Sequence, residues 1–282
     1  MSNPALQQIS EHVYWLPPAK PDRPSLCAVV GARHTLMLDS GASDAHAREF
    51  LDSLAALGGP APDYVALTHW HWDHVFGAAE IGVPLIAHQE TAQRLAVLAD
   101  YDWSDAALNA RVASGEEILA CARDIKLELP EPRTVRIARP DVVFDQALDV
   151  HLGDVDCHIR HVGGDHASDS CVIHIQPDNV LFLGDCLYDA IYTPVRHFTH
   201  RRLFPLIEAI LSFDADQFIE GHSPAVMTRS ELVDLTNKMQ HAARLVEQFG
   251  DDEQAALSHA DQPTDEDTIE FVRAFIAGRS LE

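Results

Sequence analysis

The sequence predicts an α+β fold in which two packed β-sheets are covered by helices on both outer faces. The predicted strands fall into two blocks, over residues 13–87 and 155–219, and predicted helices lie around both blocks. The chain has 282 residues, 46% of them hydrophobic, which is enough to bury a sizeable core. Because no low-complexity tract, short repeat or linker interrupts the sequence, we expect a single domain over residues 1–282.

The first half of the chain alternates strands and helices. Ser43 is a good N-cap for a helix that runs to about Leu57, where Gly58-Gly59-Pro60 ends it. A second helix is predicted from about Gln89 to Leu98. Apolar runs predict strands at Val13–Leu16, Leu26–Val30, Thr35–Leu38, Tyr64–Leu67 and Pro84–Ala87.

The second half of the chain holds the other block of strands. Residues 100–122 are predicted to be partly helical, and residues 127–140, which prolines interrupt, are predicted to be extended. Pro205 suits the first turn of a helix from about Phe204 to Leu211. The remaining elements are strands at Val155–His161, Cys171–Ile175, Val180–Leu183 and Gln217–Ile219, and C-terminal helices within residues 229–278, at about Arg229–Phe249 and Asp265–Ala277.

The chain is strongly acidic, with 44 acidic and 20 basic residues and a formal net charge of −24. Such a surface repels phosphate backbones and anionic lipids, which argues against nucleic acid or a membrane as a partner. The five cysteines form no CxxC pair and are expected to be reduced thiols. The N-terminal segment lacks the basic and apolar parts of a signal peptide, and no apolar run has the length of a membrane span, so we expect a cytoplasmic protein.

Four side chains that can bind metal lie within six residues, directly after the predicted strand Tyr64–Leu67. In an extended segment alternate side chains point the same way, so His69 and His71 can share one ion. Asp73 and His74 follow where the chain turns toward a helix and can face a second ion. Imidazole and carboxylate ligands suit zinc, with iron or manganese as alternatives.

The segment Thr68-His69-Trp70-His71-Trp72-Asp73-His74 resembles the HxHxDH signature of the metallo-β-lactamase superfamily. Other motifs of that family follow in the same order, and together they cover about residues 36–222. Asp39, in Leu38-Asp39-Ser40-Gly41, matches an aspartate that ends an early strand and supports the site from outside. The matches to the remaining ligands are His166 in Gly164–Ser168, Asp185 in Phe182–Asp185 and His222 in Glu220–Ser223.

The resemblance implies a four-layer αββα sandwich of the metallo-β-lactamase type, with the site at one edge of the two sheets. It also implies two divalent metal ions, for which zinc is our expectation. His69, His71 and His166 would hold one ion, and Asp73, His74 and His222 would hold the other. Asp185 would bridge the two ions.

The resemblance further indicates the chemistry. Two such ions share a bridging water and lower its pKa toward ~7, and Asp73 and Asp185 are the carboxylates that could move its proton. Tyr188 lies three residues after Asp185, an offset at which similar lactonases place a tyrosine against the substrate carbonyl. Tyr188 is therefore a candidate oxyanion donor, with a packed tyrosine at a strand end as the alternative.

The chain is longer between its ligand motifs than compact family members need, since 166 − 74 = 92 positions separate His74 from His166. We expect the surplus, at about residues 100–125, to form a helical cap over the site. Nearby side chains could line the pocket or could pack the cap on the body. These side chains are Tyr101, Trp103, Tyr192, His197 and His200.

The leading functional hypothesis is a dinuclear hydrolase that cleaves an ester, lactone or thioester of a small molecule by attack of a hydroxide between the metals. The alternative is an iron-dependent oxidoreductase similar to the persulfide dioxygenases of the superfamily. A β-lactamase is less well supported, because those enzymes lack the bridging aspartate. The oligomeric state is left open, with a homodimer as the common arrangement for enzymes.

Overall fold

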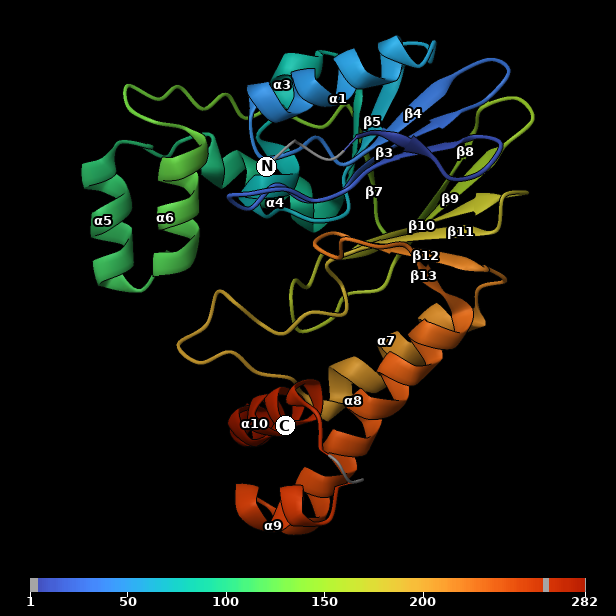
Figure 1. Ribbon diagram of the computed structural model, residues 1–282. Coiled ribbons are helices and arrows are strands. Elements are labelled where there is room, and N and C mark those ends of the chain that lie inside the picture. Colours follow the sequence, from blue (N-terminus) through green and yellow to red (C-terminus); the bar gives the residue numbers. More distant parts are fainter. Residues whose placement is uncertain (1–4, 261–263, 282) are drawn as a thin grey trace.

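Two β-sheets pack face to face between two layers of helices in the computed structural model, which describes residues 5–260 and 264–281 (Figure 1). Helices α1 and α3 lie on the outer side of the first sheet, and α7 and α8 lie on that of the second. Clusters of buried apolar side chains fill the space between the sheets and the space beneath each helical layer. The predicted αββα sandwich is confirmed.

The first sheet contains seven strands, arranged in chain order from β1 to β7. Strands β1 to β4 pair antiparallel, whereas β4 to β7 pair parallel. The carboxyl end of β5 leads directly into the histidine-rich segment, which places that segment at one edge of the sheet. The strands are β1 Gln7–Gln8, β2 Val13–Leu16, β3 Leu26–Val30, β4 Thr35–Leu38, β5 Tyr64–Ala66, β6 Leu85–His88 and β7 Val142–Phe144.

The second sheet contains six strands in the order β13-β12-β11-β10-β9-β8. Its pairs are antiparallel except β11 with β12, which run parallel. Both parallel strands therefore end on the same side, next to the segment that leaves β5. The strands are β8 Ala147–His151, β9 Asp156–His161, β10 Cys171–Gln176, β11 Val180–Gly184, β12 Gln217–Glu220 and β13 Met227–Thr228.

Local capping explains where several helices begin. The Ser43 hydroxyl accepts a hydrogen bond from the His46 amide at the start of α1, and a capping box of Thr228 and Glu231 starts α8. The helices are α1 Asp44–Ala56, α2 Trp72–Val75, α3 Ala78–Ile81, α4 Gln89–Leu98, α5 Asp105–Ser114, α6 Leu119–Glu128, α7 His200–Ser212, α8 Arg229–Phe249, α9 Glu253–Ser258 and α10 Glu266–Gly278, followed by a 3₁₀ turn at Arg279–Leu281.

Some predicted boundaries are wrong. Helix α7 begins at His200 and encloses Pro205, because Thr199 donates two hydrogen bonds to the buried Asp165 and so fixes the start of the helix one turn earlier. Helix α6 extends to Glu128, so residues 127 and 128 of the segment predicted to be extended are helical. The short strands β1, β7, β8 and β13 and helix α9 were not predicted from the sequence.

Helices α5 and α6 form a pair that stands to one side of the sandwich (Figure 1). The pair corresponds to the predicted cap insertion at about residues 100–125. Leu108 of α5 and Ile125 of α6 are fully buried and join the apolar cluster beneath the first helical layer, so the pair is anchored to the body. Among the described residues, no helix is both long and apolar enough to cross a membrane.

Candidate metal centre

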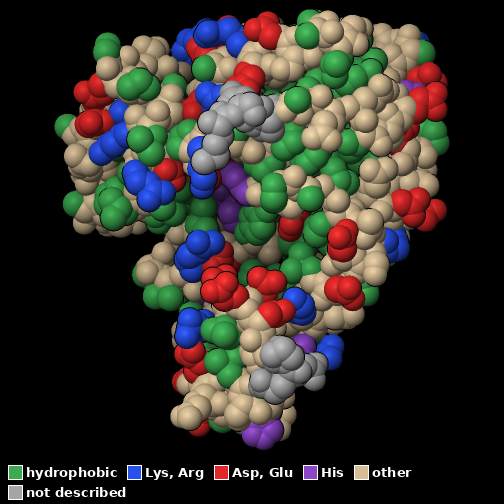
Figure 2. All heavy atoms as spheres, in the orientation of Figure 1, with side chains coloured by type: hydrophobic (Ala, Val, Ile, Leu, Met, Phe, Trp, Pro, Cys, Tyr) green, Lys and Arg blue, Asp and Glu red, His purple; other side chains and the backbone are tan. Residues whose placement is uncertain are grey.

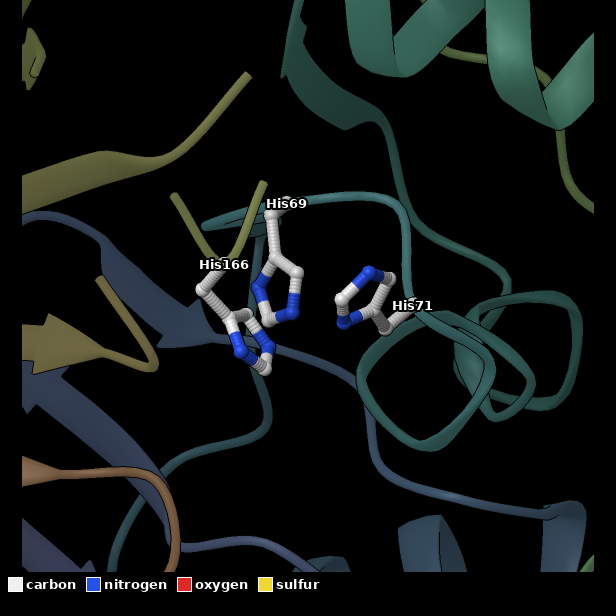
Figure 3. Close-up of side chains that lie close together, drawn as sticks. All are labelled: His69, His71 and His166. Carbon is white, nitrogen blue, oxygen red and sulfur yellow. The ribbon is translucent and has the colours of Figure 1, made fainter. Parts of the chain in front are cut away.

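Three histidines converge at the edge of the first sheet (Figure 3). His69 and His71 come from the segment after β5, and His166 comes from the loop between β9 and β10. One ring nitrogen of each lies within 4.8 Å of one ring nitrogen of each of the others, and all three side chains are buried. His69 and His71 point into the same space (Figure 3), as expected for side chains two positions apart in an extended segment.

A second group lies next to the first and contains Asp73, His74, Asp185 and His222. Asp185 follows the end of β11, and His222 follows the end of β12. The Asp185 Oδ2 atom lies 3.4 Å from His166 Nε2 and from His74 Nε2, and 3.3 Å from His222 Nε2. One carboxylate oxygen therefore contacts ligands of both groups, which is the position that a bridging residue requires.

The donor atoms fit a pair of metal ions. His69 Nε2, His71 Nδ1, His166 Nε2 and Asp185 Oδ1 are buried and have no hydrogen-bond partner within the described part of the chain. Buried polar atoms without partners are costly, so their occurrence within the two neighbouring groups indicates ligands that satisfy them. Histidines and carboxylates together form a donor set that suits zinc and also accepts iron or manganese. The structure thus contains a candidate dinuclear metal site made of the seven predicted residues, whose role as ligands stays a prediction.

Asp39 supports the site from beneath. This carboxylate is fully buried at the end of β4 and accepts hydrogen bonds from the Thr68 amide at 2.7 Å and from the Thr68 hydroxyl at 2.8 Å. Its Oδ2 atom also lies 2.7 Å from Nδ1 of His74. The contact assigns the proton of His74 to Nδ1, so that Nε2 is turned toward the other ligands.

Other ligands are oriented in the same way. The Thr68 hydroxyl, which donates to Asp39, lies 3.0 Å from His69 Nδ1 and can accept a hydrogen bond from it. His166 Nδ1 lies 3.1 Å from the carbonyl oxygen of Asp189. His222 Nδ1 faces Asp22 Oδ1 at 3.6 Å. Outer contacts of this kind fix which ring nitrogen is free to bind a metal.

The surroundings of the candidate ligands favour the protonation states that bind metal cations. Burial lowers the pKa of His69 and of His71 well below the usual range, so both rings are neutral at pH 7, the form that binds metal. Burial alone would raise the pKa of Asp185, but His74 and His222 hold it well below its ordinary value. Asp185 is therefore an ionised bridging candidate.

The candidate site opens into a cavity of about 480 Å³, which we call the metal pocket. In Figure 2 the histidines lie at the bottom of a hollow between the body and the α5–α6 pair. Ile118 and the first turns of α6 form one wall of this pocket. The lining residues are Asp22, His71, Trp72, Asp73, Ile118, Ala120, Cys121, Asp124, His166, Asp185, Tyr188, Ile191, Arg196 and His222.

Tyr188 lines this pocket, as the candidate oxyanion donor must. Its hydroxyl oxygen accepts a hydrogen bond from the His222 amide at 3.3 Å, and its ring centre lies 5.9 Å from that of His166. Burial raises the pKa of the Tyr188 phenol well above its ordinary value. The group is therefore neutral at pH 7 and keeps a proton that it can donate.

The other candidate pocket residues divide into two sets. Tyr101, Trp103 and Tyr192 line a separate cavity of about 290 Å³ on the far side of Trp72. His197 and His200 do not line the metal pocket: the His197 ring lies 2.9 Å from the Val195 carbonyl oxygen, and His200 packs edge-on against Phe204.

Several residues of the pocket were not predicted. Asp22, in the loop between β2 and β3, and Asp124, in α6, add two carboxylates to its wall. Partial burial and the nearby Asp73 raise the pKa of Asp22 to about 6. Outside the pocket lining, Glu220 at the end of β12 interacts electrostatically with Asp185, and burial raises the pKa of Glu220 to about 7. No local pattern marks these residues, because only the tertiary fold brings them to the site.

Replacing Asp39 with asparagine is expected to lower the affinity for metal by about 10- to 100-fold, the usual cost of losing an outer contact to a ligand. An asparagine at this position could keep the positive φ of 56° but would lose the charge that faces His74. Competition with a coloured chelator measures the affinity. Asp141→Asn is the matched control, because Asp141 accepts a backbone hydrogen bond at the far end of β6. Equal affinities in the two variants would contradict the role of Asp39.

Comparison with known proteins identifies the family. The family model described as the metallo-beta-lactamase superfamily matches residues 21–245, which is well over half of the chain. Among curated protein sequences, none matches the chain.

Solved structures share the fold at low sequence identity. The sec-alkylsulfatase Pisa1 from Pseudomonas sp. superposes with a TM-score of 0.67 at 17% identity, over 99% of this chain and 50% of that one, so the present chain spans half the length of the alkylsulfatase. A metallo-beta-lactamase family protein from Thermus thermophilus gives a TM-score of 0.62 at 16% identity, over 97% and 95% of the two chains. A metallo-beta-lactamase from Cronobacter sakazakii gives 0.55 at 16% identity, over 98% and 95%. With its matching family model and αββα fold, the chain belongs to the metallo-beta-lactamase superfamily.

Proposed function

We propose that this protein is a dinuclear zinc hydrolase that cleaves an ester, lactone or thioester bond of a small molecule. The observation that carries the proposal is the position of Asp185 between the two ligand groups, with the neutral phenol of Tyr188 on the wall of the same pocket. A site of this kind can bind a carbonyl oxygen and can also manage the proton of an attacking water.

The seven ligands would hold the two ions as His69, His71 and His166 on one side and Asp73, His74 and His222 on the other, with Asp185 between them. When bound, the ions supply Lewis acidity and lower the pKa of a water. Asp39, Thr68 and the Asp189 carbonyl keep the imidazole rings in the required orientation.

Hydrolysis adds the oxygen of one water to the acyl carbon and breaks the bond from that carbon to the leaving oxygen or sulfur. One proton of the water goes to the leaving atom. Asp73 and Asp185 are the ionised carboxylates closest to the reacting centre and would hold this proton between the two events. Tyr188 would donate its phenolic proton in a hydrogen bond to the carbonyl oxygen as negative charge develops there.

The charges of the pocket favour an uncharged carbonyl substrate over an anionic ester. Asp22 and Asp124 line the wall, and the nearby cation, Arg196, is held by Asp189 with a separation of 2.9 Å. Apart from the two proposed metal ions, a sulfate or phosphate ester would meet these carboxylates and no free cation among the described lining residues. The pocket therefore supports carbonyl hydrolysis more than the sulfatase activity named for the structural neighbour.

Proton release by the zinc-loaded protein tests this proposal. The panel contains simple and acyl-homoserine lactones, aryl esters, glutathione thioesters, β-lactams, phosphodiesters and alkyl sulfates. We expect release with a carbonyl class, and its loss in His166→Gln but not in His151→Gln, because His151 is exposed in β8. Release with sulfates or phosphodiesters alone would overturn the assigned bond. Silence across the panel, with a sulfur oxidation in the iron-loaded protein, would favour the oxidoreductase alternative.

Replacing Tyr188 with phenylalanine is expected to lower kcat by about 100-fold, the cost of losing one oxyanion donor. The metal content should stay at the wild-type value, because Tyr188 is not a ligand. Steady-state kinetics on the substrate found by the panel, together with metal analysis, make the test. An unchanged kcat would return Tyr188 to the role of a packed tyrosine at a strand end.

A further inference from the structure

A second cavity adjoins the metal pocket. It has a volume of about 470 Å³ and lies between the segment 187–198 and helix α10. We call it the α10 groove. Tyr188 and Arg196 line both cavities, so the two spaces share a wall at the residue that we assign to the substrate carbonyl. The groove is lined by Leu187, Tyr188, Asp189, Val195, Arg196, Phe198, Glu270, Phe271, Arg273, Ala274 and Ala277.

The walls of the groove are mainly apolar. Leu187, Phe198, Phe271 and the two alanines of α10 supply hydrocarbon surface. Val195 is 62% exposed, a large apolar side chain left facing water at the groove. Covering such surface is favourable in proportion to the apolar area removed from water.

The charged residues of the groove are engaged within the protein. Arg196 and Asp189 form a two-pronged ion pair, with 2.9 Å between Nε and Oδ2. Arg273 pairs with Glu253 of α9 at 2.8 Å. Glu270 adds a negative charge near Arg196. The groove therefore offers no free cation, among the residues described, to a charged ligand, and an uncharged hydrocarbon is the occupant that fits it.

We propose that the α10 groove holds the apolar acyl tail of the substrate, so that the protein prefers esters or lactones of medium-chain acids. The inference rests on the proposed function, because it takes the reacting carbonyl to lie at the Tyr188 hydroxyl. The acyl chain starts at that carbonyl carbon and hence begins beside Tyr188, a residue that lines both the metal pocket and the groove. The polar leaving part then stays against Asp22 and Asp124 in the metal pocket.

A chain-length series tests the assignment. With p-nitrophenyl esters from acetate to decanoate, we expect kcat/KM to rise by up to about fourfold for each methylene that enters the groove, and then to level off. Replacing Ala277 with tryptophan should fill the groove and lower the ratio of the decanoate value to the acetate value. Ala55→Trp is the matched control, because Ala55 is exposed on α1 at the opposite side of the molecule (Figure 1).

A second variant at an exposed position tests the groove without the risk that the protein misfolds. Val195→Asp changes an exposed side chain and so does not disturb the core, but it introduces a charge into the groove. We expect it to reduce the same ratio. An ester series without length dependence, or unchanged ratios in both variants, would overturn the inference while leaving the proposed function intact.

A binding measurement separates the groove from catalysis. Zinc-loaded protein should enhance the fluorescence of the neutral apolar dye N-phenyl-1-naphthylamine, decanol should displace the dye, and Ala277→Trp should abolish the signal. If the dye binds in this way but the protein hydrolyses no ester of any length, the groove would be apolar as inferred and the proposed function would be refuted. Sedimentation in which wild type is a dimer and both variants are monomers would instead show that a second copy covers the groove, and would overturn the inference.

Discussion

Replacing Asp185 with asparagine is expected to remove one of the two metal ions and to lower kcat/KM by more than about 100-fold. Losing a residue that only supports a metal ligand lowers affinity or activity by up to about 100-fold, and losing a ligand itself should have a larger effect. Asp185 Oδ2 contacts His166 from one ligand group and His74 and His222 from the other. An amide keeps the shape of the side chain but cannot supply a negative charge to two cations. Without the negative charge of Asp185, the site would have too little negative charge to hold a second divalent ion.

Metal analysis after dialysis, together with turnover on the identified substrate, measures this effect. Asp169→Asn is the matched control, because Asp169 is equally buried, lies in the neighbouring loop and accepts a hydrogen bond from Thr91 outside the ligand groups. We expect the control to keep two ions per chain. Two ions and normal turnover in Asp185→Asn would refute the bridging role.

Replacing Gly221 with alanine is expected to lower metal content and kcat/KM about as much as Asp185→Asn does, although Gly221 has no side chain that could bind metal. A Cβ atom at this position would lie 1.9 Å from Asp185 Oδ1 and 3.2 Å from His74 Cε1. Contacts this short must be relieved by movement of Asp185. We therefore expect loss of metal and of activity, together with about 1–3 kcal/mol lower stability from overpacking.

Gly58→Ala separates the two effects. Gly58 has a φ of +81°, so alanine is strained there, but its Cβ would meet no atom within 4 Å. Thermal unfolding and metal content should be compared in the metal-loaded proteins. We expect Gly58→Ala to lower stability and keep both ions, whereas Gly221→Ala should lose metal. A Gly221→Ala protein with full metal occupancy would contradict the packing argument.

The sequence predicted the regular elements best where local chemistry marks them. Helices α1, α4 and α8 match their predicted ranges within a residue or two, since Ser43, the apolar periodicity and Gly58 act over a few neighbouring positions. Strands β7 and β8 escaped prediction because their outward side chains are exposed and their apolar signal is short. The start of α7 depends on Asp165, which lies 34 residues away from Thr199.

In the candidate site too, local sequence patterns predicted some residues, but contacts between distant parts of the chain could not be predicted. His69 to His74 form one short run, and the order of the later motifs points to His166, Asp185 and His222. Asp22, by contrast, reaches His222 across 222 − 22 = 200 positions, and α10 brings its groove to Tyr188 from the far end of the chain. Such contacts depend on long-range packing, for which no pattern of spacing exists in one sequence.

The candidate ligands are divided between the two sheets: His69, His71, Asp73 and His74 follow β5 of the first sheet, and the other three follow strands of the second. Two ions held there would fasten the halves of the sandwich together. Because the unfolded chain cannot assemble such a site, binding free energy adds to folding free energy, by about 4 kcal/mol when the free metal concentration is 1,000 times Kd. Metal supply in the cell would thus govern how long each molecule survives proteolysis as well as whether it is active.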